Sequence, residues 1–308
     1  MTILLTAVLI SCSTNTEKKE NFHPISWAYQ LQGADPEEIE TSGFKLIVMD
    51  YSRDGSENSI YSKDEINSIK SHGVIPVAYI SIGEAEDYRF YWKEEWQKNP
   101  PDWLGPENPE WKGNYAVKYW DSQWQKIIFT YIDKILQQGF SGIYLDKVDE
   151  FEFWVAKGYK EEFTAEKMID FIISISKYTR NRKGKNFLII PQNGEGILKF
   201  DDGRLLNEID GWAAEDLFFN GTRRWSDEEQ KWINENRITM LQKIIKNDKF
   251  VLCVDYVDDG SGYYGDNLER IKNFISMALQ HKFSPYAARS DRELNLLNII
   301  PGIQPGNF

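Results

Sequence analysis

Short apolar segments alternate with longer amphipathic segments along most of the chain. The apolar segments are rich in β-branched and aromatic residues, and eight of them stand out: residues 25–30, 44–51, 74–82, 142–146, 187–192, 209–215, 250–256 and 285–289. A strand that is buried on both faces of a parallel sheet needs this near-continuous apolarity. The pattern therefore predicts eight parallel strands.

Helical patterns separate several of these strands, at residues 123–138, 164–180, 227–246 and 267–280. In the first of them, Trp124, Ile128 and Ile135 recur at the spacing of one buried helix face. Gly139 follows as a natural helix stop. Alternation of strands and helices around eight strands predicts an α/β fold of one domain, a closed (β/α)8 TIM barrel, in preference to an open doubly wound sheet.

The N-terminal residues differ in composition from the rest. A short apolar run ends in Leu9-Ile10-Ser11-Cys12, which resembles a bacterial lipobox, although no Lys or Arg precedes the run. We expect a lipoprotein signal peptide over residues 1–11, a lipidated Cys12 with a flexible tether over residues 12–22, and the barrel over residues 23–308. These features predict a bacterial cell-envelope protein, held on a membrane by its lipid and facing the periplasm or the exterior. A cytosolic protein with an apolar N-terminus is the alternative.

Charge and composition narrow the chemistry. The 36 basic and 48 acidic residues give a net charge of −12, which disfavours nucleic acid as a partner. His23, His72 and His281 are scattered and none has the spacing of a zinc site, so we expect no catalytic metal and no cofactor. Cys253 lies in an apolar run and is expected to be a small buried hydrophobe.

Carboxylates or amides follow six of the predicted strands. The segments are Asp50-Tyr51-Ser52, Ile82-Gly83-Glu84, Asp146-Lys147-Val148-Asp149, Gln192-Asn193-Gly194, Glu215-Asp216 and Asp255-Tyr256. In a TIM barrel the C-terminal strand ends converge on one mouth, where active sites form. A single Asp after a strand is more often a helix cap or a turn residue. Six such segments together favour a carboxylate-lined site.

Carboxylates without clustered metal ligands or an evident nucleophilic Ser or Cys favour glycosyl transfer, which uses one carboxylic acid and one carboxylate. Aromatic residues make up 14% of the chain, and Trp92, Trp96, Trp103 and Trp111 lie between the third strand and the next helix. Several prolines exclude a continuous helix there. A loop of this length is usually functional, so its rings either line a sugar groove or pack the loop onto the barrel.

Two longer segments are Tyr79-Ile80-Ser81-Ile82-Gly83-Glu84-Ala85-Glu86 and Gly139-Phe140-Ser141-Gly142-Ile143-Tyr144-Leu145-Asp146. They resemble the third- and fourth-strand signatures of glycoside hydrolase family 114, whose members are similar to endo-α-1,4-polygalactosaminidase. Shorter similarities are Trp27-Ala28-Tyr29-Gln30, Asp50-Tyr51-Ser52, Pro191-Gln192-Asn193-Gly194 and Val254-Asp255-Tyr256. The resemblance covers roughly residues 26–289.

The resemblance implies a barrel that cleaves an α-1,4-linked galactosamine polymer or a related amino-sugar chain, with Asp146 as nucleophile and Glu215 as acid/base. Lys147 could keep Asp146 ionised, and the apolar residues before Glu215 would raise its pKa. Alternatively, Asp146 is a structural acceptor and Glu215 a loop cap. We expect the substrate to be held by Asp50, Tyr51, Tyr79, Glu84, Asp149, Gln192, Asn193, Asp255 and Tyr256.

Other functions are compatible with the same pattern. A non-catalytic carbohydrate-binding surface lipoprotein would keep the Trp-rich loop and the carboxylates, but not two carboxyl groups at a working distance. A metal-dependent deacetylase or phosphoesterase would also use Asp clusters, yet the chain lacks clustered His ligands. A substrate-binding protein for uptake usually has two lobes, against which the single series of eight strands argues.

Overall fold

The computed structural model of the chain describes residues 26–306. The signal peptide, the lipidated Cys12 and the tether expected within residues 1–22 lie outside the described residues, so the anchor stays a prediction. Within residues 26–306, no helix combines the length and the apolarity needed to cross a membrane.

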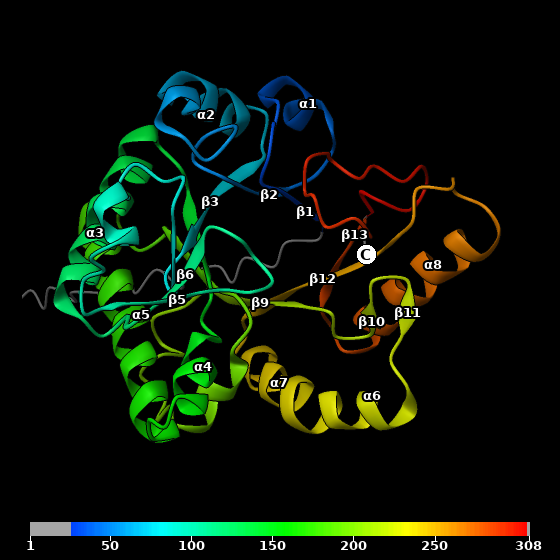
Figure 1. The fold of residues 1–308 in the computed structure, drawn as a ribbon. Coiled ribbons are helices and arrows are strands. Elements are labelled where there is room, and N and C mark those ends of the chain that lie inside the picture. Colours follow the sequence, from blue (N-terminus) through cyan, green and yellow to red (C-terminus); the bar gives the residue numbers. More distant parts are fainter. Residues whose placement is uncertain (1–25, 307–308) are drawn as a thin grey trace, which may run out of the picture.

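Each of the eight predicted strands is present, and all eight run parallel (Figure 1). They are β1 (Trp27–Gln30), β2 (Leu46–Met49), β3 (Ile75–Ser81), β7 (Gly142–Asp146), β8 (Leu188–Pro191), β9 (Gly211–Glu215), β12 (Phe250–Asp258) and β13 (Ser284–Arg289). Strands β1-β2-β3-β7-β8 form one ladder and β9-β12-β13 another. The strand centres are buried on both faces, as their continuous apolarity predicts.

Two seams join these ladders into a closed barrel. Between β8 and β9, Gln192 forms a parallel bridge with Ala213, and the Asn193 N–H donates to the Ala213 carbonyl at 2.9 Å. Between β13 and β1, the Trp27 indole N–H donates to the Ser284 carbonyl at 2.8 Å. The closed parallel barrel confirms the predicted (β/α)8 TIM-barrel fold.

The helices lie outside the strands (Figure 1). They are α1 (Pro36–Thr41), α2 (Lys63–Ser71), α3 (Ser122–Gln138), α4 (Glu150–Ala156), α5 (Glu161–Lys183), α6 (Asp227–Ile233), α7 (Thr239–Lys246) and α8 (Gly265–Gln280). Three predicted helices match α3, α5 and α8. The fourth is interrupted, because a π-helical turn, Asn234–Ile238, joins α6 to α7. Short 3-10 helices cover Glu57–Ser59, Glu94–Gln97 and Glu195–Lys199.

The long segment after β3 forms a small antiparallel sheet that the sequence pattern did not predict. Its strands are β4 (Glu84–Glu86), β5 (Leu104–Glu107) and β6 (Asn114–Val117), in the order β4-β6-β5. Trp96 and Trp103 are buried, and the Trp103 ring lies 5.2 Å from that of Trp124 on α3. These two rings therefore pack the insertion onto the barrel, whereas Trp111 is 54% exposed.

A buried ion cluster fixes the insertion to the end of β2. The Arg89 guanidinium donates to both carboxylate oxygens of Asp50, at 2.9 and 2.7 Å, and to Glu86 at 2.7 Å. The Arg89 side chain is 1% exposed. A charge that is removed from water in this way is stable only when it is paired and hydrogen-bonded.

Replacing Arg89 by Met should lower the free energy of unfolding by about 3–5 kcal/mol, because Asp50 and Glu86 would be buried without a counter-charge. The measurement is urea denaturation at neutral pH. The matched control is Arg204→Met, because the exposed Arg204 pairs with Asp170 and Asp202 at the surface; the expected loss is below about 1 kcal/mol. Equal losses of unfolding free energy in the two variants would contradict the conclusion that Arg89 neutralises buried charges.

Candidate active site

The two candidate catalytic carboxyl groups lie at the ends of strands separated by a single strand. Asp146 is the last residue of β7 and Glu215 the last of β9, with β8 between them in the barrel. Both side chains are partly exposed. Because parallel strands of a closed barrel end at the same mouth, the two carboxyl groups share one site.

A tyrosine from a neighbouring strand holds each carboxyl group. The Tyr79 hydroxyl donates to Asp146 Oδ2 at 2.5 Å, and the Tyr256 hydroxyl donates to Glu215 Oε1. Asp146 pairs with Ser81 of β3, and Glu215 pairs with Val254 of β12. Each tyrosine thus lies two residues from the paired position, on the same face of the sheet. Strand register therefore brings both tyrosines, which were expected to bind substrate, to the carboxyl groups.

Additional donors complete the two carboxylate sites. The Lys147 N–H donates to Asp146 Oδ1 at 2.7 Å, and the Asn193 side-chain amide donates to Glu215 Oε2 at 3.0 Å. Below them, the buried Tyr144 ring lies next to Tyr29, with their centroids 5.3 Å apart. Burial raises the pKa of Tyr144, and the charges of Glu215 and Asp146 raise it further. Both carboxyl groups therefore lie close to the same buried aromatic rings.

Burial and mutual repulsion govern the protonation of the pair. Burial raises the pKa of Asp146 to about 8, and the charge of Glu215 raises it as well, against smaller lowering effects of Lys147 and Tyr79. Burial likewise raises the pKa of Glu215, which the Tyr256 hydrogen bond partly offsets. Lys147 lowers the pKa of Asp146, as expected, but burial raises this pKa by more. Two such neighbours titrate as a unit, and one shared proton leaves one acid and one carboxylate.

Three adjacent strand ends turn sharply at the site. Lys147, Asn193 and Asp216, which follow β7, β8 and β9, have φ of 63°, 55° and 55°. A non-glycine residue in this left-handed region costs about 1–2 kcal/mol, and such strain is common at functional sites. Gly194 is required next to Asn193, since a Cβ there would lie 2.5 Å from the backbone nitrogen of Asp149. The turns leave the side chains of the preceding residues, Asp146, Gln192 and Glu215, at the mouth of the barrel.

Arg237 supports Glu215 and was not identified from the sequence. It lies in the π-helical turn, and its guanidinium donates to the Glu215 carbonyl at 3.0 Å and to Asn193 Oδ1 at 3.2 Å. It also pairs with Glu195. An Arg inside a predicted amphipathic helix is expected to be exposed to solvent. The sequence pattern therefore gave no indication that Arg237 contacts Glu215. A π-helical turn inserted at a functional site is a recurrent way to redirect such a side chain.

Three residues that were expected to bind substrate make hydrogen bonds within the protein. Asp50 binds Arg89, as described above. Asp255 accepts from three consecutive backbone N–H groups, those of Leu217, Phe218 and Phe219, at 2.8–3.0 Å. Tyr51 is buried and donates to Glu57 at 3.1 Å. These side chains hold the loops at the strand ends in place.

Glu84, Asp149 and Gln192, which were also expected to bind substrate, lie near the end of β7. Glu84 accepts from Asn108 at 2.8 Å and pairs with Lys147 at 3.0 Å. Among the described residues, Asp149 Oδ1 and Gln192 Oε1 are buried without a hydrogen-bond partner. A cavity of about 270 Å³ is lined by Glu84, Pro106, Glu107, Asn108, Pro109, Ala116, Lys147, Asp149, Glu150, Glu152 and Phe153.

Glu150 is a second buried acid of this cavity that the sequence did not single out. It is 4% exposed, and its Oε1 has no hydrogen-bond partner among the described residues. Burial raises the pKa of Glu150 to about 9, although Lys147 lowers it. At neutral pH its carboxyl group therefore carries a proton and can donate a hydrogen bond.

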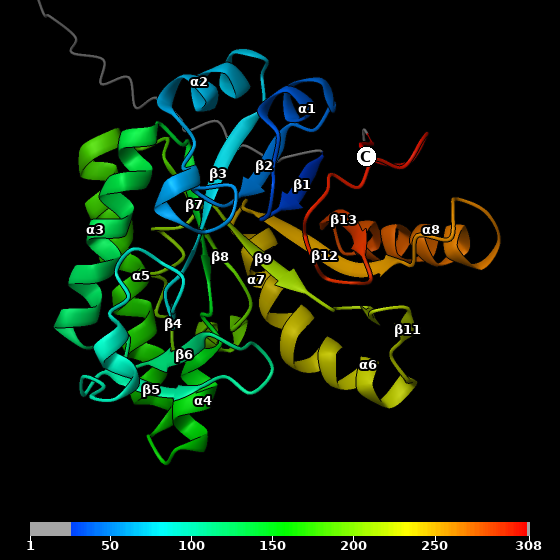
Figure 2. The same ribbon diagram turned by 45° about the horizontal axis from the view of Figure 1, so that its top comes forward.

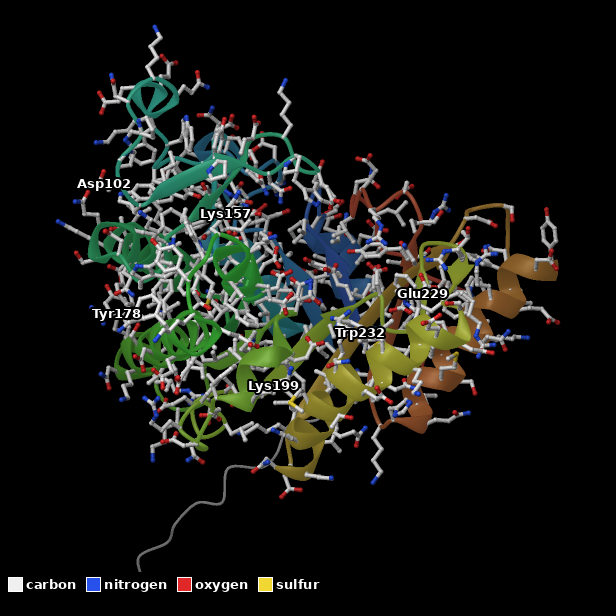
Figure 3. All side chains as sticks on the ribbon, turned by 60° about the horizontal axis from the view of Figure 1, so that its bottom comes forward. Asp102, Lys157, Tyr178, Lys199, Glu229 and Trp232 are labelled. Atoms are coloured by element: carbon white, nitrogen blue, oxygen red, sulfur yellow. The ribbon has the colours of Figure 1, made fainter. Side chains whose placement is uncertain are left out.

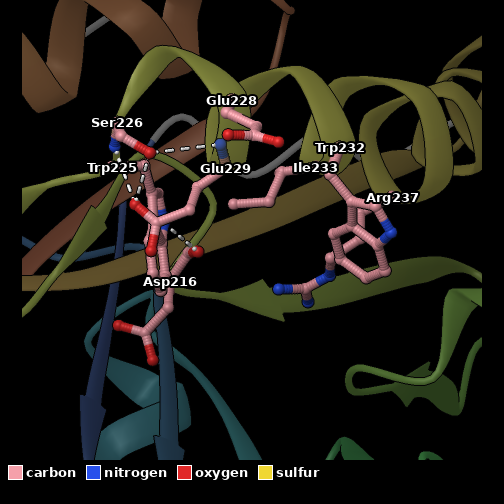
Figure 4. A pocket seen from close by; sticks show the side chains of 8 residues that line it. All are labelled: Asp216, Trp225, Ser226, Glu228, Glu229, Trp232, Ile233 and Arg237. Atoms are coloured by element: carbon pink, nitrogen blue, oxygen red, sulfur yellow. Dashed lines mark hydrogen bonds between the residues drawn. The ribbon is translucent and has the colours of Figure 1, made fainter.

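A larger cavity, of about 520 Å³, lies at Asp216, the residue that follows Glu215 (Figure 4). It is lined by Asp216, Trp225, Ser226, Glu228, Glu229, Trp232, Ile233 and Arg237. The first cavity borders the insertion and α4, whereas this one borders α6, on the far side of β9 from them (Figure 2). The carboxyl pair is thus flanked by two cavities.

A sequence model of glycoside-hydrolase family GH114 matches residues 11–302. The chain belongs to glycoside-hydrolase family GH114. It is 58% identical to an uncharacterized protein of Methanocaldococcus jannaschii, over 92% of this chain and 81% of that protein. It is 50% identical to an uncharacterized protein of Thermotoga maritima, over 96% of this chain and 90% of that protein.

Two solved structures share the barrel of this GH114 protein. The glycoside hydrolase domain of PelA from Pseudomonas aeruginosa aligns with a TM-score of 0.66 at 15% identity, covering 89% of this chain and 97% of that one. Ega3 from Aspergillus fumigatus, in complex with galactosamine, aligns with a TM-score of 0.64 at 16% identity, covering 92% and 97%. At these identities the likeness shows the fold.

A metal site and a reactive cysteine are two other kinds of chemistry to consider in this GH114 protein. Across residues 26–306, no group of three or more His, Cys, Asp or Glu side chains is arranged to hold a metal ion. Cys253 is free and buried in β12, which confirms the expectation of a small buried hydrophobe.

Replacing Glu215 by Gln should lower the pKa of Asp146, because the repelling charge of Glu215 is removed. The measurement is a carbon-13 NMR titration of the Asp carboxyl groups, with the Asp146 signal assigned by its loss in Asp146→Asn. Glu110→Gln, at an exposed site, is the control and should leave the Asp146 titration unchanged. An unchanged pKa of Asp146 in Glu215→Gln would show that the two groups are not coupled.

Glu150→Gln should gain stability relative to the wild type as pH rises. A carboxyl group whose pKa is raised on folding stabilises the protein below its unfolded pKa, and this stabilisation is lost as pH rises through the folded value of about 9. Gln does not titrate, so at about 1.36 kcal/mol per pKa unit the difference in unfolding free energy should shift by up to about 5 kcal/mol between pH 4.5 and 9. Urea denaturation at several pH values measures it. A pH-independent difference would contradict the burial argument.

Proposed function

We propose that the protein is an endo-acting glycosidase that hydrolyses an α-1,4-linked galactosamine-containing, or related amino-sugar, polysaccharide. Asp146 acts as the nucleophile and Glu215 as the acid/base. The observation that carries the proposal is the coupled carboxyl pair at the barrel mouth, in which each member is oriented by its own tyrosine.

The first step starts from the state of the pair in which its one proton lies on Glu215 and Asp146 is ionised. The raised pKa of Asp146 favours the opposite position in the free protein, so the mechanism requires the proton to move to Glu215 before the attack. Protonated Glu215 gives its proton to the glycosidic oxygen while the Asp146 carboxylate attacks the anomeric carbon, so that the leaving chain departs with a new hydroxyl group. The Tyr79 hydroxyl holds Asp146 in one orientation, and Asn193 and Tyr256 hold Glu215. Orientation of both groups before the reaction is where the protein contributes to the rate.

The second step uses the same electrostatic coupling in reverse. Once Asp146 is bonded to the sugar, its negative charge is gone and the pKa of Glu215 falls. Glu215, now ionised, takes a proton from water as the water oxygen attacks the anomeric carbon and releases Asp146. The pair then holds one proton again, as at the start.

Charge supports an amino-sugar substrate. The chain has a net charge of −12, and Glu84 and Asp149 line the cavity next to Lys147. A polymer whose sugars bear ammonium groups would be attracted to such a surface. Ega3, which shares the barrel, was solved in complex with galactosamine. This ligand is a property of Ega3, and it makes galactosamine the first substrate to test.

The test is hydrolysis of purified α-1,4-galactosamine polymer by the full-length protein, with released oligomers identified by mass spectrometry. Wild type should release short oligomers, and Asp146→Asn and Glu215→Gln should each lose at least about 10³-fold in rate. Glu110→Gln is the matched control and should retain activity. If wild type cleaves neither this polymer nor a panel of acetylated and neutral glycans, the proposal is wrong. Binding without cleavage would indicate the carbohydrate-binding lipoprotein.

A further inference from the structure

The 520 Å³ cavity differs from the carboxylate-lined mouth because two indole rings line it (Figure 4). Trp225 precedes α6, and Trp232 lies on α6, where it is 59% exposed (Figure 3). A single exposed aromatic ring on a protein surface needs no explanation. Two Trp rings in one cavity beside a candidate catalytic carboxyl group are a different case, since aromatic rings with a few polar groups characterise ligand sites.

The Trp225 ring is held rigidly. Its indole N–H donates to the Asp216 carbonyl at 2.9 Å, and the Arg223 guanidinium lies 4.9 Å from its ring centroid. Arg223 is itself fixed by Glu229 at 2.9 and 3.2 Å. Because a fixed ring loses little conformational entropy when it binds a ligand, Trp225 is a preformed flat surface.

The start of α6 is fixed just as firmly. Ser226 and Glu229 form a reciprocal capping box, in which the Ser226 N–H donates to Glu229 at 2.8 Å and the Glu229 N–H donates to Ser226 at 3.3 Å. Trp232 therefore projects from a helix whose first turn is locked.

Two lining residues connect the cavity to the acid/base. Asp216, which follows Glu215 in the chain, forms one wall, and Arg237, which donates to the Glu215 carbonyl, forms another. Arg292 pairs with Asp216 at 2.9 Å and lies 4.1 Å from the Tyr256 ring centroid. A ligand in the cavity would therefore contact Asp216 and Arg237, the chain neighbour and a hydrogen-bond partner of the group that, in the proposed mechanism, protonates the leaving oxygen.

We propose that this cavity binds one pyranose unit of the leaving-group side of the substrate chain, stacked on Trp232 and Trp225. The C–H face of a sugar ring packs on an indole face, and Asp216, Glu228 and Ser226 offer oxygen atoms to its hydroxyl or amino groups. The inference rests on the proposed function, since it takes Glu215 as the acid. It adds that productive binding requires sugar on the leaving-group side of the cleaved bond, as endo action needs.

The experiment compares two substrates that differ in their leaving group, an α-1,4-galactosamine oligomer series and α-galactosaminyl fluoride. Fluoride places no sugar in the cavity. Trp232→Ala should lower kcat/KM for the oligomers about 10- to 100-fold and leave kcat/KM for the fluoride within about threefold of wild type, which corresponds to roughly 1.4–2.8 kcal/mol of lost stacking. Trp232→Phe, which keeps an aromatic ring, should recover most of the loss.

Lys231→Ala is the matched control. Lys231 is the exposed neighbour of Trp232 on α6 and does not line the cavity. Its kinetics should equal those of wild type on both substrates. The proposal is overturned if Trp232→Ala has the same kinetics as Lys231→Ala. It is also overturned if Trp232→Ala loses activity equally on the oligomers and on the fluoride, since an equal loss would indicate a general structural defect.

Failure of the proposed function would be seen separately, as absence of cleavage of both substrates by wild type. In that case calorimetric titration of the oligomers into wild type, Trp232→Ala and Lys231→Ala decides the inference. Binding that only Trp232→Ala loses supports a sugar site in this cavity. Equal binding by all three proteins, or no binding by any, overturns it.

Discussion

Closure of eight parallel strands into one barrel is the constraint on which the site depends. Because β7, β8 and β9 are adjacent, Asp146 and Glu215 are held at one mouth by the backbone ladder, with no direct contact needed between them. The same strand register places Tyr79 next to Asp146 and Tyr256 next to Glu215. A slip of one residue in β7 or β9 would turn the carboxyl group to the opposite face.

The site is built at the expense of stability. Burial and repulsion raise the pKa values of both carboxyl groups, and Lys147, Asn193 and Asp216 have left-handed backbone conformations. Each of these features costs free energy, which the buried core offsets. The strain is concentrated at the three strand ends that carry the pair, which is typical of a functional site.

The sequence determined much of the architecture. Continuous apolarity located all eight strands, because a strand buried on both faces of a parallel sheet must be apolar throughout. Helical periodicity located α3, α5 and α8, and the polar residues after the strands marked the mouth with Asp146 and Glu215. These are local properties, and each leaves a signature within a few consecutive residues.

Only the tertiary structure decided which polar residues serve the site. Asp50 and Asp255 follow strands as Asp146 does, yet partners distant in the chain engage them within the protein. Arg237 and Trp232 read as part of an ordinary amphipathic helix, and only a π-helical turn and the packing of α6 bring them to the mouth. The physical reason is that burial, pairing and pKa depend on residues far apart in sequence, which the barrel brings together.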